Sequence, residues 1–178
     1  MKPVVTVVAI VLAGLCASQA YALSEADFQA AGRKYGISPL LLQAIGNIES
    51  QHGELLGKYT VSEVVDATQL KFLKKIARHT SRDISEFKGS YAGAMGYMQI
   101  MPSTFHIYAQ DGDDDDIRDP LNPYDSLATA AYFLARTLAR KDTVRAALKT
   151  YNNSDMYCDK VLALYQQLEV ESQVASSQ

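Results

Sequence analysis

The chain lacks several features that would place it in other classes of protein. It contains two cysteines, Cys16 and Cys158, and only Cys158 lies beyond the first 22 residues, so the remaining chain can form no internal disulfide. Basic residues are not in excess, since 17 stand against 20 acidic ones, and six of the acidic residues lie between Asp111 and Asp119. Nothing in the charge therefore favours nucleic acid as a partner. Convincing strand alternation and long repeats are also absent.

The longest apolar run lies at the beginning of the chain. A short positive region, Met1-Lys2, precedes the apolar residues 4–17, which are few for a membrane span. Ala20-Tyr21-Ala22 has the small-x-small pattern of a cleavage site. We therefore expect residues 1–22 to be a signal peptide removed near Ala22, and the mature protein to be periplasmic or exported. An uncleaved membrane anchor is the alternative.

The rest of the sequence has the period of amphipathic helices, and several of these segments begin with a residue that can cap a helix. Six helices are predicted. The first two run from Ser24 to near Gly36 and from Ser38-Pro39 to Gly53, and the third contains Phe72, Leu73 and Ile76. The fourth runs from Asp125 or Ser126 to Leu138, and the last two begin at Thr143 and at Ser154. A small hairpin around residues 87–100 is the only β structure expected. We predict a mainly α protein with a single domain at residues 23–169 and a flexible tail at residues 170–178.

A cluster of basic side chains lies on one side of the predicted helix that contains Phe72. Its members are Lys71, Lys74, Lys75 and Arg78. Such a cluster is most simply a solvated face, and contact with an anionic polymer is the alternative.

The segment "IGNIESQHG", residues 45–53, places a glutamate among apolar residues. At about 100° per residue, Glu49 projects between Leu42 and Ile45, inside the apolar arc of the helix. A carboxylate in such surroundings is costly unless it is paired, protonated or used in chemistry. Because burial disfavours the ionised form and raises the pKa, Glu49 suits a general acid. Pairing with a lysine, or capping of a neighbouring helix, is the alternative.

The segment "KGSYAGAMGYMQIMPSTF", residues 88–105, has a composition that suits a sugar. Gly93 and Gly96 permit backbone conformations that a side chain would block and let a ligand approach the main chain. Tyr97 and Met98 offer flat or polarisable apolar surface, and Gln99 has an amide that donates and accepts hydrogen bonds. Sugars have apolar faces and hydrogen-bonding edges. An ordinary tight loop is the alternative explanation of the glycines.

Three motifs in order carry a resemblance to a known family. They are "AIGNIESQHG", with Glu-Ser-x-x-Gly; "KGSYAGAMGYMQIMPSTF", with Gly-Ala-Met-Gly-x-x-Gln-x-Met-Pro-Ser; and "ALKTYNNS", with Tyr-Asn-Asn. In these motifs the chain resembles the lytic murein transglycosylases of the membrane-bound lytic transglycosylase B type, over about residues 36–168. The resemblance implies a single lysozyme-like helical domain that acts on peptidoglycan glycan strands.

The resemblance also implies roles for individual residues. Glu49 matches the single catalytic acid and base, and Ser90 matches a hydroxyl near that glutamate and the substrate N-acetyl group. Gln99 and the backbone of residues 95–98 match the floor of the saccharide groove. The full substrate-binding set that the resemblance implies is Ser90, Gly93, Met95, Gly96, Tyr97, Met98, Gln99, Tyr151 and Asn152, of which the last two close the site from the other side.

The reaction implied by the resemblance needs one carboxylate. Glu49 would protonate the glycosidic oxygen between N-acetylmuramic acid and N-acetylglucosamine, and the substrate's N-acetyl carbonyl would stabilise the anomeric centre. Glu49 would then take the proton of the muramyl C6 hydroxyl, which closes a 1,6-anhydro ring. Glycoside hydrolysis usually uses two carboxylates, and no second one stands in the motifs. No cofactor is required for this chemistry.

The segment "DGDDDDIRDPLNPYD", residues 111–125, follows the alternation by which a calcium loop presents oxygens, and several members of the family carry an EF-hand-like loop at this point. The ligand set expected for a structural Ca²⁺ is Asp111, Asp113, Asp115, Ile117, Asp119 and Asn122. Asp116 replaces the glycine of the sharp turn, and Asn122 replaces the bidentate acid, so we expect weak binding. A solvated acidic turn without an ion is the alternative.

Other functions stay open at this point: a hydrolytic muramidase, a catalytically silent peptidoglycan-binding or secretion-associated protein, and a calcium-binding signalling module. The expected partner is the peptidoglycan glycan strand, and we expect a monomer. The sequence does not separate growth, recycling and the making of room for envelope-spanning machinery as the biological task.

Overall fold

Residues 23–177 are described by the computed structural model, so the predicted signal peptide at residues 1–22 lies outside the described residues. This part of the chain contains eight α-helices, one 3-10 helix (η1) and one two-stranded sheet. The elements are α1 Glu25–Tyr35, α2 Pro39–Ser50, β1 Tyr59–Thr60, α3 Val61–Val64, α4 Ala67–Thr80, η1 Ile84–Glu86, β2 Lys88–Gly89, α5 Pro102–Tyr108, α6 Pro123–Leu138, α7 Val144–Tyr151 and α8 Asp155–Ala175. The prediction of a mainly α protein with a small β element is confirmed.

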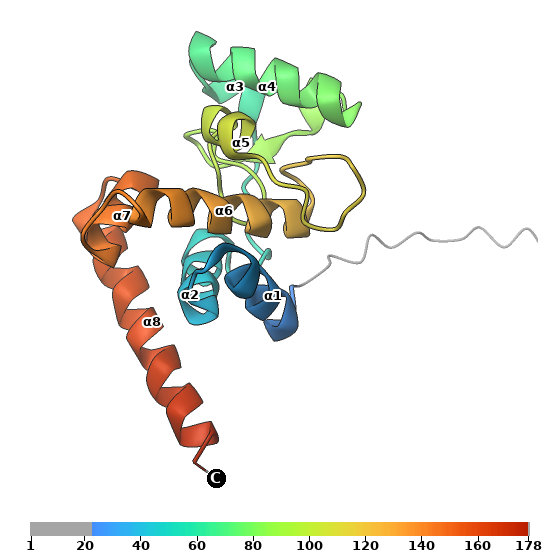
Figure 1. Ribbon diagram of the computed structural model, residues 1–178. Helices are drawn as coiled ribbons and strands as arrows, with labels where there is room; N and C mark the ends of the chain where they lie inside the picture. Colours follow the sequence, from blue (N-terminus) through green and yellow to red (C-terminus); the bar gives the residue numbers. More distant parts are fainter. Residues whose placement is uncertain (1–22, 178) are drawn as a thin grey trace, which may run out of the picture.

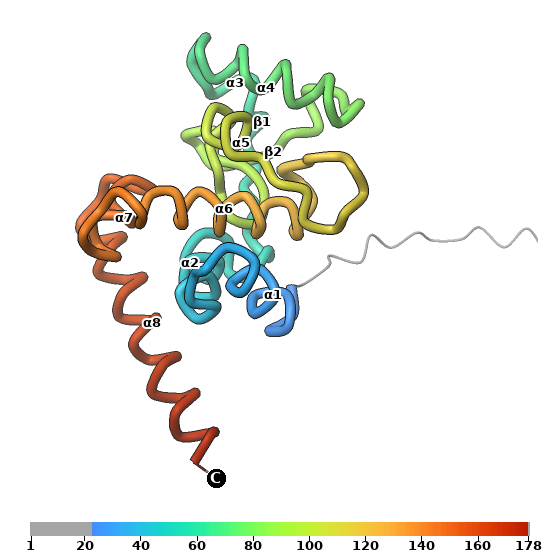
Figure 2. The backbone as a smooth tube through the Cα atoms, in the orientation of Figure 1, coloured from blue at the N-terminus to red at the C-terminus, as the bar shows by residue number. Residues whose placement is uncertain are grey.

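Helix α6 runs through the middle of the fold (Figure 1). The pair α1 and α2 packs on one side of α6, and α5 with α4 beyond it lies on the other. The chain then passes through α7, and α8 packs along α2 (Figure 2). The core between these layers includes Leu42, Ile45, Met98, Leu134 and Leu148, each at most 1% exposed.

Side-chain caps start four helices at the predicted places. The hydroxyls of Ser24, Ser38, Thr143 and Ser154 each accept a hydrogen bond from a backbone N–H in the first turn of α1, α2, α7 and α8. Such a bond satisfies one of the N–H groups that have no partner within the helix. These four predicted helix starts are confirmed.

Helix α6 starts earlier than predicted. Its cap is Asn122, whose Oδ1 accepts hydrogen bonds from the N–H groups of Tyr124 and Asp125. Pro123 follows as the first helical residue, a position that suits proline because the N–H it lacks would be unpaired there. The predicted caps, Asp125 and Ser126, were wrong: both lie buried within the helix.

Helix α2 ends at Ser50, before the predicted stop at Gly53. Gln51 and His52 adopt left-handed conformations, with φ of 48° and 56°. The buried hydroxyl of Ser50 accepts a hydrogen bond from the N–H of Gly53 at 2.9 Å, which holds this turn in place. Glu49 therefore lies in the last turn of α2 and not in its interior.

The predicted hairpin at residues 87–100 is replaced by a different pairing. The regular sheet joins β1 to β2 in antiparallel register, with Tyr59 opposite Gly89. Within the predicted segment only single bridges occur, from Gly89 to Met95 and from Met95 to Ile100. A strand of two residues is too short to show an alternating pattern, so β1 gave no signal in the sequence.

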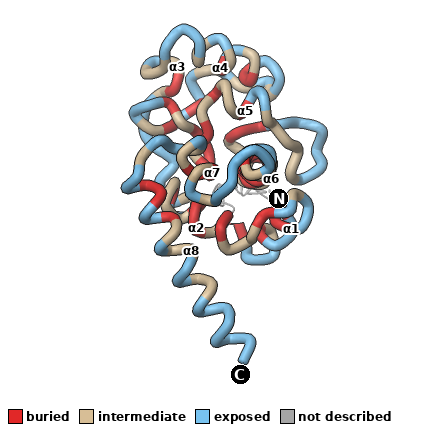
Figure 3. Tube along the Cα trace, turned by 60° about the vertical axis from the view of Figure 1, so that its left-hand side comes forward, coloured by how far each residue is buried: buried red, intermediate tan, exposed pale blue. Residues whose placement is uncertain are grey.

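The last helix extends beyond the body of the protein. Helix α8 continues to Ala175, and its residues from Val170 on are exposed (Figure 3). Residues 170–175 of the predicted tail are thus helical, and the flexibility of this end stays a prediction. No helix within residues 23–177 combines the length and the apolar character that crossing a membrane requires.

Candidate active site

Glu49 lies half-buried in the last turn of α2, beside one tyrosine from the end of α7 and one from the first turn of α8. These are Tyr151 and Tyr157; burial raises the pKa of both phenols, and the charge of Glu49 raises it further. Burial raises the pKa of Glu49 to about 7, and the Tyr157 hydroxyl lowers it by less. A carboxyl with this pKa can hold, release and recover a proton near neutral pH.

The hydroxyl of Tyr157 has no partner. The residue is 8% exposed, and among the buried side-chain nitrogen and oxygen atoms of residues 23–177 its Oη is the one without a hydrogen bond. It lies close enough to the carboxyl of Glu49 to lower the pKa of that group, but the two form no hydrogen bond of ordinary geometry. Buried polar groups are rarely left unpaired. This pair of side chains is therefore the most unusual feature of the site.

Ser50 joins the end of α2 to the glycine-rich segment. Its hydroxyl donates to the carbonyl of Tyr97 at 2.7 Å. The ring of Tyr97 covers Gly46 and Gly53, where an added Cβ would come within 3.0 Å of the ring in each case. Its hydroxyl is 3.0 Å from Nδ1 of His52. The side chain next to Glu49 in the sequence thus fixes the position of residue 97.

Tyr151 holds the same segment from the opposite side. Its hydroxyl donates to the carbonyl of Met98 at 2.6 Å. The N–H of Met98 in turn donates to the hydroxyl of Ser126 in α6 at 2.9 Å. Helices α2, α6 and α7 therefore all bond to residues 97 and 98. The backbone beside Glu49 is held by hydrogen bonds from three directions.

Several predicted substrate-binding side chains lie in the core. Met95, Tyr97 and Met98 are 0%, 3% and 0% exposed, so the expectation that the rings and thioethers of residues 97 and 98 offer surface to a sugar was wrong. Their side chains face inward because the apolar segment between the glycines packs against α2. Only the backbone of these residues is left for a ligand, as the proposed groove floor requires. Gln99 is half-buried, and its amide donates to the carbonyls of Leu56 and Gly96.

The glycines of this segment serve close approach within the chain. Gly96 has φ of 74°, and an added Cβ would lie 1.9 Å from the carbonyl oxygen of Pro120. Gly93 has φ of 87°, and an added Cβ would lie 2.1 Å from the side chain of Val65. Both positions require glycine for the fold itself. Access for a ligand is not needed to explain them.

The remaining predicted site residues lie near the surface. Ser90 is half-buried, and its hydroxyl accepts the N–H of Ala94 at 3.1 Å. Asn152 follows α7 and is exposed. Next to Ser90, Tyr91 is 79% exposed, so an aromatic face is open to solvent beside the glycine-rich segment.

Three of the predicted calcium ligands are gathered in the acidic loop. One carboxylate oxygen from each of Asp111, Asp113 and Asp115 lies within 4.8 Å of the other two. The carboxylate of Asp111 also accepts the N–H groups of Asp115 and Asp116, which curls the loop around it. Oxygen ligands from alternate residues are what Ca²⁺ prefers.

The other predicted ligands make different contacts. Asp119 is buried and pairs with Arg82, with an oxygen–nitrogen distance of 2.6 Å. Asn122 caps α6 with its oxygen and donates from Nδ2 to Asp113 at 2.7 Å. Ile117 is exposed, and its N–H donates to the carboxylate of Asp115 at 2.7 Å.

The buried carboxyl of Asp125 joins the two ends of the acidic loop by hydrogen bonds. Asp125 accepts the N–H of Gly112 at 2.6 Å and the N–H of Asp119 at 2.7 Å, so it ties together two points of the loop. Burial is the main cause that raises its pKa to about 7, and the charges of Asp113 and Asp111 contribute. Positive charge at the loop would relieve this repulsion.

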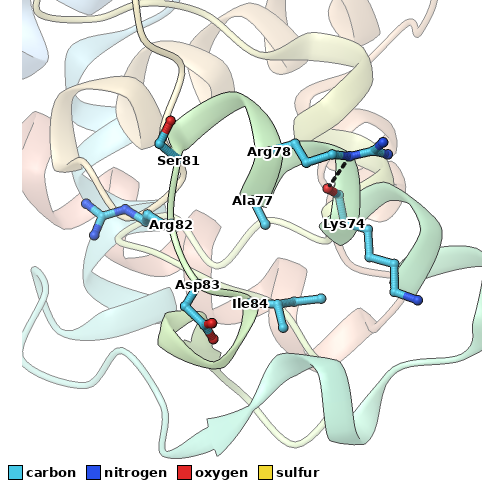
Figure 4. A pocket seen from close by; sticks show the side chains of 7 residues that line it. All are labelled: Lys74, Ala77, Arg78, Ser81, Arg82, Asp83 and Ile84. Atoms are coloured by element: carbon cyan, nitrogen blue, oxygen red, sulfur yellow. Dashed lines mark hydrogen bonds between the residues drawn. The ribbon is translucent and has the colours of Figure 1, made fainter.

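The basic cluster on α4 borders a hollow that lies apart from Glu49. Lys74 and Arg78 lie at one side of the hollow and Arg82 at the other (Figure 4). Lys74 and Arg78 are exposed, and Arg78 donates to the backbone carbonyl of Lys74. The first of the two alternatives for this cluster, a solvated face, accounts for what is seen.

Sequence reasoning missed three residues of the site. Tyr157 lies four residues before Val161 and so extends the apolar stripe of α8 by one turn, a signal that was available. Ser50 and Asp125 gave no such signal. Their partners, the carbonyl of Tyr97 and the N–H of Gly112, are distant in sequence and belong to the backbone.

Residues 16–146 of the chain match the transglycosylase SLT domain. The membrane-bound lytic murein transglycosylase B of Escherichia coli (strain K12) is 29% identical over 124 residues, which are 62% of this chain and 34% of that protein. The chain thus spans about a third of the length of this relative. The matched residues include Glu49, the glycine-rich segment and the acidic loop, but end before Tyr151.

Two solved structures share the fold. The E. coli lytic transglycosylase Slt35 in complex with calcium has a TM-score of 0.73 at 18% identity, over 83% of this chain and 71% of that chain. SltB3 from Pseudomonas aeruginosa in complex with NAG-anhNAM-pentapeptide has a TM-score of 0.56 at 30% identity, over 62% and 33%. The predicted lysozyme-like fold of a lytic transglycosylase is confirmed.

Proposed function

Since the chain belongs to the transglycosylase SLT domain family, we propose that it cleaves the β-1,4 bond between N-acetylmuramic acid and N-acetylglucosamine in peptidoglycan and leaves 1,6-anhydromuramyl ends. The observation that carries this proposal is the half-buried carboxyl of Glu49. Its pKa of about 7 lets it both release and accept a proton near neutral pH. A group that must act first as acid and then as base needs such a value. The complex of SltB3 with an anhydromuramyl peptide supports the choice of product.

In the first half of the proposed reaction, Glu49 is protonated. It donates its proton to the glycosidic oxygen, the bond from that oxygen to C1 of the muramyl sugar breaks, and the electron pair stays with the departing N-acetylglucosamine. The carbonyl oxygen of the substrate's own N-acetyl group bonds to C1. The buried surroundings of Glu49 favour this step because they keep the carboxyl neutral until the proton leaves.

In the second half, Glu49 is a carboxylate. It accepts the proton of the muramyl C6 hydroxyl, whose oxygen bonds to C1 and displaces the N-acetyl oxygen. The anhydro ring closes, and Glu49 is again protonated. Glu49 is the only carboxylate that the described contacts place beside Tyr151 and Tyr157, which agrees with a reaction that uses one carboxylate in place of two.

Digestion of murein with the purified protein tests this proposal. We expect soluble fragments whose muramyl ends are lighter by one water molecule than reducing ends and resist borohydride reduction, as mass spectrometry will show. Reducing muramyl ends would instead identify a hydrolytic muramidase. The variant Glu49→Gln should bind insoluble murein as the wild type does but release no fragments.

A catalytically silent murein-binding protein is separated by the same assay. Such a protein would sediment with murein and release nothing in its wild-type form, and Glu49→Gln would change neither result. Ser90 and Tyr151, which are present, favour the enzyme.

We expect the protein to act in the compartment that holds peptidoglycan, after removal of the signal peptide near Ala22. We also expect a monomer, and sedimentation of the mature chain tests this. Work beside envelope-spanning machinery stays a prediction.

We also propose that the acidic loop binds a structural Ca²⁺ through Asp111, Asp113 and Asp115. The gathered oxygens support this, as does the calcium complex of Slt35. The bound ion would tie the loop between α5 and α6 and supply no chemistry to Glu49. Because Asp119 and Asn122 have other partners, binding should be weaker than in a loop with a full set of acids.

Calorimetric titration of the chelator-treated protein with calcium tests the loop. We expect Asp113→Asn to weaken binding by at least about tenfold, because it removes one of three charged ligands. Asp114→Asn is the matched control, since it removes the same charge from the same loop outside the cluster. If both variants weaken calcium binding equally, the ion is attracted by the acidic charge of the loop in general and not by the cluster. If the wild type gives no heat, the loop is a solvated turn that binds no calcium.

A further inference from the structure

Tyr157 is held in a fixed, buried position although its hydroxyl has no hydrogen-bond partner. It lies in the first turn of α8, where its N–H donates to the capping hydroxyl of Ser154. The side chain is buried, so its ring cannot turn its hydroxyl toward solvent. Helix α8 packs along α2, and the hydroxyl interacts with the carboxyl of Glu49 at the end of α2. The fold thus fixes a hydrogen-bond donor next to the group that changes charge.

The neighbouring hydroxyls are already engaged. Tyr151, from α7, donates its hydrogen to the carbonyl of Met98 at 2.6 Å. Tyr97, from the glycine-rich segment, has its hydroxyl against His52 at 3.0 Å. Tyr157 is therefore the tyrosine of this group whose hydrogen is still available. Burial is the main cause of the raised pKa of Glu49, and the Tyr157 hydroxyl acts against it.

We propose that Tyr157 is a positioning residue for Glu49, and that its hydroxyl donates a hydrogen bond to the Glu49 carboxylate in the half of the reaction in which Glu49 is ionised. This inference rests on the proposed function of Glu49 as acid and base. It names a group outside the three motifs that carry the family resemblance.

The two protonation states of Glu49 call for different surroundings. While Glu49 is neutral, its proton must be directed to the glycosidic oxygen, and the Tyr157 hydroxyl can stay unpaired. Once Glu49 is ionised, the buried carboxylate needs a donor, because burial makes an unpaired charge far more costly than an unpaired hydroxyl. Burial also raises the pKa of Tyr157 well above its ordinary value, so the phenol keeps its hydrogen and acts only as a donor.

The variant Tyr157→Phe tests this inference through the pKa of Glu49. We expect a Glu49 pKa about one unit higher in the variant, followed by NMR of the side-chain carboxyl carbon, because the bond that favours the charged form is lost. The pH profile of kcat should move upward by the same amount, with a fall in kcat of about tenfold and little change in KM. A purely structural role would lower kcat by one factor at every pH and leave the profile where it is.

Tyr165→Phe is the matched control. It removes the same hydroxyl about two turns further along α8, where the phenol interacts with Ser38, the residue that caps the start of α2, and with Glu169 of α8. We expect it to leave the Glu49 pKa and the kcat profile unchanged. An equal shift in both variants, or no shift in Tyr157→Phe, would overturn the inference.

A second measurement uses the wild-type fold and does not depend on the variant being stable. With tyrosine labelled at Cζ, the signal of Tyr157 should follow the titration of Glu49 with the same midpoint, and the step should vanish in Glu49→Gln. A Tyr157 signal without such a step would overturn the inference. The carboxyl titration needs no substrate, so it tests the contact between Tyr157 and Glu49 separately from the reaction. The contact can be found even if digestion yields reducing ends, and it can be missing even if digestion yields anhydro ends.

Discussion

The replacement Glu49→Gln should make the protein more stable at and above neutral pH. The pKa of Glu49 is about 7 in the folded protein, against 4.5 as the reference value for the unfolded chain. Because the folded-state value is the higher one, the folded state holds the proton over a range where the unfolded chain has released it. Stability is therefore lost as the pH rises from about 4.5, and the loss is complete above about 7.

The size of this loss follows from the shift. A difference from 4.5 to about 7 corresponds to about 3 kcal/mol, at 1.36 kcal/mol for each pKa unit. Glutamine has nearly the same shape and carries no charge, so the variant escapes the loss. We expect the free energy of unfolding to rise by about 3 kcal/mol at pH 8, by about 1 kcal/mol at pH 5, and by almost nothing at pH 4. For a domain of this size the gain at pH 8 corresponds to a Tm higher by about 6–12 °C.

Urea unfolding followed by far-UV circular dichroism at pH 4, 5 and 8 measures these values. Other groups with raised pKa, such as Asp125, titrate in both proteins and cancel in the difference. The control is Glu63→Gln, which removes an exposed carboxylate and should change stability little at any pH. A gain of the same size at pH 4 and pH 8, or no gain at pH 8, would refute the assignment of Glu49 as a carboxyl kept neutral by burial.

Three further predictions concern the surroundings of Glu49. Tyr157→Phe should raise the free energy of unfolding by about 1 kcal/mol at pH 5, because it removes a buried hydroxyl without a partner; a loss of stability in urea unfolding would contradict this. Ser50→Ala should lower it by about 1–3 kcal/mol and reduce kcat, since the carbonyl of Tyr97 and the N–H of Gly53 lose their shared partner; unchanged stability would mean that water replaces the hydroxyl. Gly96→Ala should cost more than about 2 kcal/mol, whereas Gly36→Ala, with nearly the same φ but nothing within 4 Å, should cost about 1 kcal/mol; equal losses in thermal unfolding would show that backbone conformation alone decides.

Much of the helical fold could be predicted because its signals are local. A capping hydroxyl and the N–H it accepts are three residues apart, as in Ser154 and Tyr157, so both stand in one short segment. The start of α6 was misplaced because Asn122, Asp125 and Ser126 are all good caps by residue type. The choice of Asn122 depends on Pro123 and on the burial of Asp125 beneath the acidic loop, and only the second of these is hidden in the sequence.

The surroundings of Glu49 could be predicted only in part. Its place on the apolar arc of a helix was visible, and burial with a raised pKa agrees with it. The residues that surround it come from α7 and α8, about 100 positions later in the chain, and the packing that brings them together is long-range. The glycine-rich segment shows the opposite failure. Its composition favours contact with a sugar, yet the same glycines and apolar side chains are accounted for by contacts within the core.

The two tyrosines beside Glu49 show why composition cannot assign a role. Tyr151 is half-buried and Tyr157 is buried beside the same carboxyl, but the hydroxyl of Tyr151 holds the backbone of Met98 and that of Tyr157 has no partner. Through the first, with Ser50 on the other side, residues 97 and 98 stay fixed while Glu49 changes charge. Through the second, in the role proposed for Tyr157, the carboxylate gains a hydrogen-bond donor when Glu49 is ionised. A site built in this way costs stability in its resting state, and it needs little reorganisation when the proton moves.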